Sequence, residues 1–393
     1  MARAAGRRAA PAVARVGDAL AAVGTPALVL DLDVFEANCR ALVETMRQFE
    51  GRGPGGGNVT LRPHAKAHKS SALARRQLEL LGPAAVGLGC QTLAEAEAMV
   101  WGGLKDVTIT NEVVPADKVQ RLAELAQTPD VSLGVCVDSA ANARALSAAL
   151  TGCGASIKVL VECNVGQNRC GVETAEEAVA LAQLVAELPG LDFDGYQAYH
   201  GAIQHVRGFE DRRAECQKVA DKVVALNKAF ADAGLTCRTV TGGGTGTFLF
   251  DAGSGLYTEV QPGSYFFGDA DYGRNDWSAA KAWRQSLLIA ATVISQNPAR
   301  RTVVLDSGLK AVDLGSGVPL VLGHEETWTF ANGGDEHGVV SVPEPAPLPE
   351  VGDKLYLIPG HIDPTFNMHR CVVCVRNEVV EDVLEIDASG PGF

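Results

Sequence analysis

Short apolar runs alternate with longer amphipathic stretches along residues 25–244. The short runs are rich in β-branched side chains, which predicts eight strands, at residues 27–32, 59–64, 84–89, 107–110, 131–137, 157–163, 193–199 and 238–242. Helical spacing of apolar residues, often opened by Ser, Thr or Pro, predicts helices at residues 70–81, 93–101, 115–126, 140–150, 174–188 and 206–233. Strand and helix therefore alternate through this part of the chain.

This alternation favours a (β/α)8 TIM barrel, because an open doubly wound sheet usually needs only five or six strands. The doubly wound sheet remains the alternative. Beyond residue 276 the strand-like runs follow one another without long helices, at residues 286–294, 302–306, 320–322, 339–342, 354–358, 371–376 and 379–384. We therefore predict a basic tail at residues 1–24, a barrel at residues 25–275 and a β domain at residues 276–393.

Composition supports a folded, acidic protein. The 393 residues are 47% hydrophobic and 21% charged, which is enough to bury a large core. The 34 Lys and Arg against 47 Asp and Glu leave a charge of −13, which repels nucleic-acid phosphates. No apolar run approaches the roughly 20 residues that span a bilayer. We expect a soluble intracellular protein without nucleic-acid or membrane partners.

Residues 1–17 depart from this balance, because they hold four Arg and no acid. An Arg-rich and Ala-rich start is typical of an organelle transit peptide, and a disordered basic tail is the alternative. The predicted location is therefore cytoplasmic, or organellar if this segment is a transit peptide. The ten cysteines follow no secretory signal, so reduced thiols are expected.

The end of the second predicted strand carries a cluster of basic side chains. Active sites of barrels are built at the carboxyl ends of the strands, and this strand runs into R-P-H-A-K-A-H-K at residues 62–69. In an extended segment, His64, Lys66 and His68 would point to one side and Lys69 to the other. Neighbouring cations lower the pKa of a Lys and make its amine a Schiff-base nucleophile. A solvated basic loop is the competing interpretation.

The two glycine clusters have different expected roles. Residues 51–57 lie at the amino end of the barrel, where loops rarely carry chemistry, and are predicted to form a surface insertion. The last barrel strand runs into T-G-G-G-T at residues 241–245, where bare N–H groups can converge on an anion. Its spacing matches no nucleotide-binding loop. An amine at Lys66 together with a phosphate site suggests pyridoxal phosphate bound through Lys66.

Further polar side chains follow the sixth and seventh strands. Arg169 could hold a ring oxygen or ring nitrogen of such a cofactor, or could pack on the barrel rim. Tyr199, His200 and His205 place a phenol and two imidazoles near the same mouth. Histidine is the side chain best suited to move a proton near neutral pH.

The β domain contains a candidate metal site. His361 and Asp363 stand two residues apart, on one side of a segment expected to be extended, so both can reach one ion. A closed zinc site made by Cys371 and Cys374 with His361 or His369 is one alternative. A simple His–Asp pair in a turn is another.

Five segments together resemble the metal-activated D-threonine aldolase and D-serine dehydratase group, which has the alanine-racemase type of fold. They are R-P-H-A-K-A-H-K at residues 62–69, N-R-C-G at 168–171, T-G-G-G-T at 241–245, P-G-S-Y at 262–265 and P-G-H-I-D-P-T at 359–365. The resemblance implies that Lys66 binds the cofactor, that Arg169 lies at its phenolic oxygen and Tyr199 at its ring nitrogen. It also implies a phosphate site made by Thr241, Gly242, Gly243, Gly244, Thr245 and Tyr265.

The resemblance further implies that His361 and Asp363 bind the divalent ion, with His205 as the base and His200 as the less favoured candidate. By this resemblance, the metal segment of the dehydratases has the pattern H-x-C, whereas this chain has H-x-D at residues 361–363. Asp363 therefore favours aldol cleavage and a hard ion, Mn²⁺ first, with Mg²⁺, Co²⁺ or Zn²⁺ as alternatives.

The predicted activity is retro-aldol cleavage of D-threonine and related D-β-hydroxy-α-amino acids to glycine and an aldehyde. The alternatives are dehydration or cleavage of D-serine or 3-hydroxy-D-aspartate on the same scaffold, and a carrier of pyridoxal phosphate without turnover. The resemblance also implies a homodimer.

Overall fold

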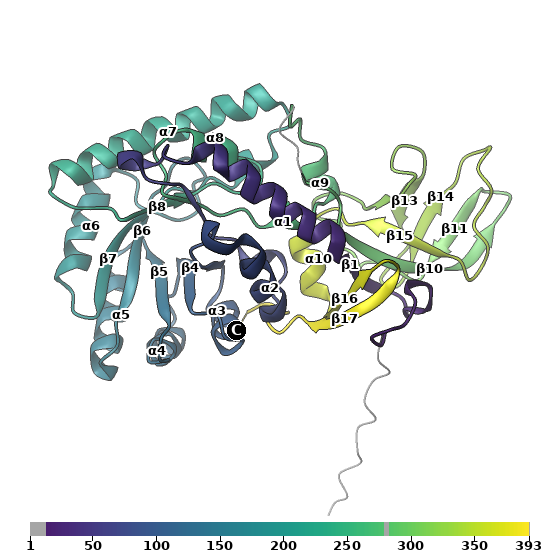
Figure 1. The fold of residues 1–393 in the computed structure, drawn as a ribbon, viewed down its shortest axis with the longest axis horizontal. Helices are drawn as coiled ribbons and strands as arrows, with labels where there is room; N and C mark the ends of the chain where they lie inside the picture. Colours follow the sequence, from purple (N-terminus) through teal and green to yellow (C-terminus); the bar gives the residue numbers. More distant parts are fainter. Residues whose placement is uncertain (1–12, 279–282, 393) are drawn as a thin grey trace, which may run out of the picture.

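The computed structural model describes residues 13–278 and 283–392. These residues form two lobes, one of alternating strands and helices and one built on antiparallel strands (Figure 1). Residues 1–12, which are half of the predicted tail, lie outside the described residues. Within the described ranges, no helix is both long and apolar enough to cross a membrane.

The larger lobe is organised around an eight-stranded parallel sheet in the order β2-β9-β8-β7-β6-β5-β4-β3. Bridges from Leu61 to Ala85 and from His64 to Gly89 bring its two edges together, so the sheet curls. Because the order follows the chain without a switch point, the predicted barrel is confirmed and the doubly wound alternative is wrong. The strands are β2 (Thr60–Leu61), β3 (Leu88–Cys90), β4 (Asp106–Glu112), β5 (Ser132–Val137), β6 (Ile157–Glu162), β7 (Leu191–Gln197), β8 (Thr239–Gly242) and β9 (Glu259–Val260).

Helices cover the outside of this sheet (Figure 1). The side chain of Ser70 caps the first of them, and Thr174 forms a capping box with Glu177, which is why these helices begin where the sequence predicts. The helices are α2 (Ser71–Leu81), α3 (Leu93–Trp101), α4 (Ala116–Leu125), α5 (Ala140–Cys153), α6 (Ala175–Glu187), α7 (Phe209–Asp232) and α8 (Phe248–Gly253).

The first predicted barrel strand lies in the other lobe. β1 (Ala27–Asp31) pairs antiparallel with β10 and parallel with β16, and the two-residue strand β9 takes its expected place in the barrel. Residues 27–30 are buried whichever way their side chains point, so the apolar run suits either sheet. This strand therefore belongs with the predicted β domain, and the other domain limits stay predictions.

The smaller lobe contains a nine-stranded sheet in which most neighbours are antiparallel. Its main path is β13-β14-β11-β10-β1-β16-β17, and β15 connects β12 to β10. The predicted series of strands after residue 276 is confirmed, with β13 as an additional strand. The strands after β1 are β10 (Leu287–Asn297), β11 (Thr302–Leu305), β12 (Leu320–Val321), β13 (Thr329–Asn332), β14 (Gly338–Ser341), β15 (Lys354–Ile358), β16 (Cys371–Arg376) and β17 (Val379–Glu385).

Three helices lie where the lobes meet, namely α1 (Leu32–Met46), α9 (Ala270–Gly273) and α10 (Ile362–Met368). Phe267, in the loop before α9, packs against Phe35 of α1 with ring centroids 5.5 Å apart and against Phe366 of α10 at 5.3 Å. All three rings are fully buried. This apolar contact fixes α10 against the barrel mouth.

Candidate active site

A cavity of about 310 Å³ opens where the barrel strands end. Lys66 from the loop after β2, Arg169 after β6, Tyr199 after β7 and His205 just beyond it all line this cavity. His200 is not among its lining residues. The structure therefore brings together most of the barrel residues that the sequence singles out.

Lys66 lies on a single 3₁₀ turn (Ala65–Ala67) and not on an extended segment. Its Nζ is 3.1 Å from Oδ2 of Asp363, which reaches the barrel mouth from the other lobe. The charge of Asp363 raises the pKa of Lys66, so the expected lowering by neighbouring cations is wrong.

Because the segment turns, the side chains of His64 and His68 have surroundings different from those of Lys66. Burial lowers the pKa of His64 to about 3, and its Nε2 is 2.8 Å from Oγ1 of Thr110. His68 is fully buried, with its ring 5.8 Å from that of Phe267. The alternating arrangement predicted for an extended segment is therefore wrong, and Lys66 alone of the three reaches Asp363.

Lys69 ties this turn to α10. Its Nζ donates to Oδ1 of Asn367 at 2.7 Å and to the carbonyl of Gly390 at 3.1 Å, and lies 3.5 Å from a carboxylate oxygen of Glu95. The Gly390 N–H donates to the same Asn367 oxygen at 2.9 Å. The carboxyl-terminal segment thus holds the Lys66 turn and α10 together.

The loop after β8 is a close-packed backbone cradle. Gly243 has a φ of +65°, and a Cβ on Gly244 would lie 2.7 Å from Oε1 of Gln204 and 3.3 Å from the ring of Tyr199. Among the described residues, the N–H groups of Gly243 and Thr245 have no acceptor. Free N–H groups in a glycine turn fit an anion such as a phosphate.

The other predicted members of this cradle contribute in different ways. Thr241 accepts from the side chain of Gln261 at 2.7 Å, while Gly242 ends β8 so close to Ala198 that a Cβ would meet its carbonyl at 2.4 Å. Tyr265 donates its backbone N–H to Oγ1 of Thr245 at 3.1 Å, and its hydroxyl lies beside α1. Its side chain therefore supports the cradle from behind.

Arg169 and Tyr199 face one another across the cavity wall. The guanidinium carbon of Arg169 is 5.9 Å from the centroid of the Tyr199 ring, at the outer range of a cation–π contact. A planar cation and a phenol at the mouth are compatible with the predicted contacts to a pyridine ring. These two assignments stay predictions.

His361 and Asp363 meet at the start of α10 rather than on an extended segment. His361 is the N-cap residue, Asp363 is in the first turn, and Nε2 of His361 lies 3.8 Å from Oδ1 of Asp363. Burial lowers the pKa of His361, but the carboxylates of Asp363 and Asp269 outweigh it and raise that pKa to about 9. One imidazole nitrogen and one carboxylate fit a divalent ion, whose binding would displace a proton.

Comparisons with known proteins agree over the whole chain. The alanine racemase N-terminal domain model matches residues 30–271, and the putative serine dehydratase domain model matches residues 286–375. The chain is 47% identical over 380 residues to a D-threonine aldolase of Arthrobacter sp, covering 97% of this chain and 96% of that protein. The chain belongs to the alanine racemase N-terminal domain family, in the group of the D-threonine aldolases.

Other members of this group are also similar. A 3-hydroxy-D-aspartate aldolase of Paracoccus denitrificans is 41% identical over 376 residues, covering 94% of this chain and 93% of that protein. The crystal structure of a D-threonine aldolase from Filomicrobium marinum has a TM-score of 0.90 and 40% identity, with 96% of this chain and 99% of that chain covered. The resemblance stated from the five sequence segments is thus confirmed.

The two histidines after β7 differ in their surroundings in this member of the family. His205 lines the cavity, and its ring centroid is 6.3 Å from that of His361. His200 faces Gly166, where an added Cβ would lie 3.0 Å from its Nε2, and burial lowers its pKa. The geometry therefore favours His205 as the residue that acts on a ligand.

Sequence reasoning missed two acidic residues of the site. Asp269 is fully buried beside Nδ1 of His361 at 2.8 Å, and Oδ2 of Asp271 is 2.5 Å from Nδ1 of His205. Both lie near the end of the predicted barrel domain, well after its last predicted strand at residues 238–242. The sequence signal that could have found them is a pair of acids two residues apart, shortly after P-G-S-Y at residues 262–265.

The alternative zinc site around Cys371 and Cys374 is not assembled in the described residues. The two cysteines lie on β16, and Nε2 of His369 is 2.9 Å from the carbonyl of Ala311. The described ranges contain one group of three candidate ligands, and none of these residues belongs to it.

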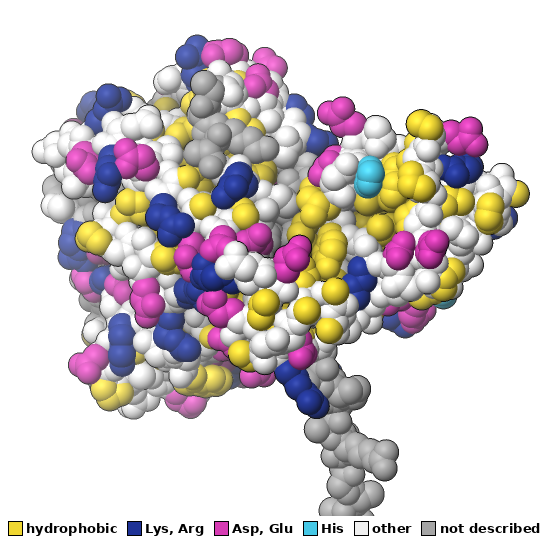
Figure 2. Space-filling model, turned by 45° about the vertical axis from the view of Figure 1, so that its right-hand side comes forward, with side chains coloured by type: hydrophobic (Ala, Val, Ile, Leu, Met, Phe, Trp, Pro, Cys, Tyr) yellow, Lys and Arg dark blue, Asp and Glu magenta, His cyan; other side chains and the backbone are white. Residues whose placement is uncertain are grey.

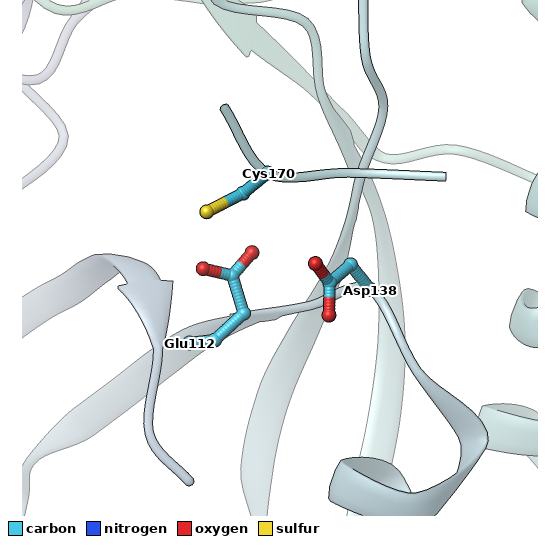
Figure 3. A group of neighbouring side chains, drawn as sticks. All are labelled: Glu112, Asp138 and Cys170. Atoms are coloured by element: carbon cyan, nitrogen blue, oxygen red, sulfur yellow. The ribbon is translucent and has the colours of Figure 1, made fainter. Parts of the chain in front are cut away.

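That group consists of Glu112, Asp138 and Cys170, at the ends of β4 and β5 and in the loop after β6 (Figure 3). Their ligand atoms lie within 4.8 Å of one another. Burial and the charge of Asp138 raise the pKa of Glu112, and Asp138 accepts from the N–H of Gly171 at 3.2 Å. The group therefore anchors the loop that carries Arg169, and nothing else in the described part of the chain points to an ion there.

Proposed function

We propose that this chain cleaves D-threonine and related D-β-hydroxy-α-amino acids to glycine and an aldehyde, with pyridoxal phosphate and a divalent ion. One observation carries the proposal: the amine of Lys66 lies 3.1 Å from Asp363, and Asp363 lies 3.8 Å from Nε2 of His361. An amine that could bind an aldehyde and a nitrogen–oxygen pair that could hold a metal thus lie side by side at the barrel mouth.

The residues present fit pyridoxal phosphate. Lys66 is the amine that would bind its aldehyde, and the free N–H groups of Gly243 and Thr245 would hold its phosphate. Arg169 and Tyr199 would contact its ring. When bound, this cofactor stabilises the negative charge left on the substrate α-carbon.

His361 and Asp363 would hold the divalent ion. The pair of one imidazole and one carboxylate accepts Mn²⁺, our first choice, and also Mg²⁺, Co²⁺ or Zn²⁺. When bound, the ion lowers the pKa of a hydroxyl that it contacts. A mutant of a similar protein, D-threo-3-hydroxyaspartate dehydratase, has been solved in a metal-free form, which supports a metal in this group.

His205 would remove the proton of the substrate β-hydroxyl. It lines the cavity, its side chain is 39% exposed, and Nδ1 already contacts Asp271, which leaves Nε2 for the substrate. Breaking of the bond between the α- and β-carbons then releases the aldehyde, and protonation of the α-carbon gives glycine.

The second candidate is cleavage or dehydration of 3-hydroxy-D-aspartate or D-serine. The 41% identity to a 3-hydroxy-D-aspartate aldolase favours it as a related substrate class. At the position of Asp363 the dehydratases of this group are expected to have Cys. The carboxylate in this chain therefore favours cleavage over loss of water. A carrier without turnover is disfavoured, because it has no need of the His361–Asp363 pair.

Product identification tests the proposal. The holoenzyme with Mn²⁺ is incubated with D-threonine, D-serine or 3-hydroxy-D-aspartate, with and without a chelator. Glycine and acetaldehyde from D-threonine, lost with the chelator, support it. Pyruvate and ammonia from D-serine as the dominant products would overturn it. Asp363→Ala should lose activity and keep the visible absorption band of the cofactor.

We also propose that the chain forms a homodimer. Apolar side chains of the smaller lobe are exposed, among them Leu309, Val318 and Leu322, and Figure 2 shows hydrophobic side chains gathered on one face of this lobe. Large exposed apolar patches mark interaction sites. Sedimentation equilibrium at micromolar concentration decides this, and a monomer there would refute it. The intracellular location stays a prediction.

A further inference from the structure

We propose that Asp269 and Asp271, at the start of α9, orient the two imidazoles of the site for separate tasks. Asp269 positions His361 as a metal ligand, and Asp271 positions His205 as the base. The inference rests on the proposed function, because it assumes an ion at His361 and a substrate proton at His205. Both acids are positioning residues that act through a histidine.

Both oxygens of Asp269 are held in place. Its side chain is fully buried, with Oδ2 2.8 Å from Nδ1 of His361 and 3.2 Å from the N–H of Ile362. Oδ1 accepts from the N–H of Tyr272 at 2.7 Å. A carboxylate fixed on both sides accepts a hydrogen bond from Nδ1–H of His361, which leaves Nε2 as the lone-pair nitrogen, on the side that faces Asp363.

Asp271 is held by two arginines on one side and faces His205 on the other. Its side chain is 5% exposed, and Oδ1 lies 2.5 Å from Nη2 of Arg207 and 2.9 Å from Nη2 of Arg274. Oδ2 lies 2.5 Å from Nδ1 of His205. The N–H···O angle of this contact is not that of an aligned hydrogen bond. Catalytic hydrogen bonds commonly tighten only when substrate is bound.

One backbone segment therefore sets both histidines. The N–H of Ala270 donates to the carbonyl of Pro359 at 3.0 Å, and that of Asp271 to the carbonyl of Gly360 at 2.9 Å. The start of α9 thus runs beside the segment that leads into His361. The rings of His205 and His361 are perpendicular, with centroids 6.3 Å apart. The relative position of the two rings would set how far the base lies from an ion held by His361.

An amide tests the role of each carboxylate with little change of shape. Asn can present its NH₂ group to Nδ1, which places the ring proton on Nε2. For His361 this blocks the nitrogen that binds the ion. For His205 it removes the lone pair that accepts the substrate proton. The two substitutions are therefore expected to have different effects, although the residues are neighbours on one turn.

The experiment compares Asp269→Asn, Asp271→Asn and the control Asp232→Asn, which lies exposed at the end of α7. Binding of Mn²⁺ to each holoenzyme is measured from the paramagnetic resonance signal of free Mn²⁺, and kcat and KM for D-threonine are measured at saturating Mn²⁺. Asp269→Asn should raise the Kd for Mn²⁺ by about 10–100-fold and keep the visible absorption band. Asp271→Asn should keep the Kd within threefold and lower kcat by at least about 100-fold.

Conservative variants separate orientation from folding. Asp269→Glu and Asp271→Glu retain a carboxylate, so each should restore part of what its Asn variant loses, and they test the inference if an Asn variant does not fold. Suppose that the wild type binds Mn²⁺ and cleaves D-threonine. Equal effects of the two Asn variants on Mn²⁺ affinity and on kcat would then overturn this inference alone. A wild type that binds no Mn²⁺ would overturn the proposed function and this inference with it.

Discussion

Gly243→Ala is expected to disturb the cradle after β8 and to weaken cofactor binding. The residue has a φ of +65°, and an added Cβ would lie 2.8 Å from Oδ2 of Asp251 and 3.1 Å from Cγ1 of Val260. Holding a residue other than glycine in this region costs about 1–3 kcal/mol. Overfilling the core around it costs about 1–3 kcal/mol more. The free energy of unfolding should therefore fall by about 2–6 kcal/mol.

The chain offers a matched control at Gly55, which has a φ of +66° and no atom within 4 Å of an added Cβ. Gly55→Ala carries the same backbone strain without the packing conflict, in a loop at the opposite end of the barrel. It should lose about 1–3 kcal/mol and bind the cofactor as the wild type does. The difference between the two variants isolates the packing of the cradle.

Urea unfolding of the cofactor-free proteins measures stability, and titration with pyridoxal phosphate, followed by its visible absorption, measures affinity. Movement of the N–H groups of Gly243 and Thr245 by a few tenths of an ångström should raise the Kd at least about tenfold, which is about 1.4 kcal/mol. The reasoning would be refuted by equal stability and equal affinity in the two Ala variants.

Three further predictions concern single side chains. Lys66→Ala should abolish the visible absorption band of the holoenzyme, and a retained band would contradict its role as the binding amine. His205→Ala should lower kcat at least about 100-fold, whereas His200→Ala should stay within about threefold; a reversed order would exchange their roles. Burial raises the pKa of Asp251 to about 7, so the native chain keeps a proton that the unfolded chain loses, and stability should fall as the pH rises from about 4 to about 7. Asp251→Asn should remove this dependence of stability on pH. The assignment would be contradicted if the urea midpoints of the wild type and the variant changed with pH in the same way.

The order of strands and helices followed from local pattern, but the sheet to which each strand belongs did not. The barrel strands from β2 to β8 overlap the apolar runs of the sequence. From β3 to β8, each strand pairs with the strand that follows it in the chain. β1 has the same appearance and is followed by a helix, yet its partners are Leu287–Asn297 and Cys371–Arg376. β9, with two residues, is too short to leave a pattern.

At the site, chemistry was easier to predict than shape. Lys66, His361 and Asp363 were identified by their residue types and spacing, and the structure brings them to one cavity mouth. Their backbone shapes were predicted as extended, whereas both segments turn, at Ala65–Ala67 and at Ile362–Met368. The direction of the Lys66 pKa was wrong because the opposing charge comes from a residue almost 300 positions away.

Because β1 belongs to the sheet of the second lobe, its strand pairing cannot be completed during synthesis until β16 has been made. β16, the parallel neighbour of β1, is made about 340 residues later, which at about 5–20 residues per second takes about 17–70 s. A nascent chain that ends at residue 275 contains every strand of the barrel sheet and none of the partners of β1. Such a chain leaves this apolar strand without a neighbour in its sheet until β10 has been made, and without its second neighbour until β16 follows.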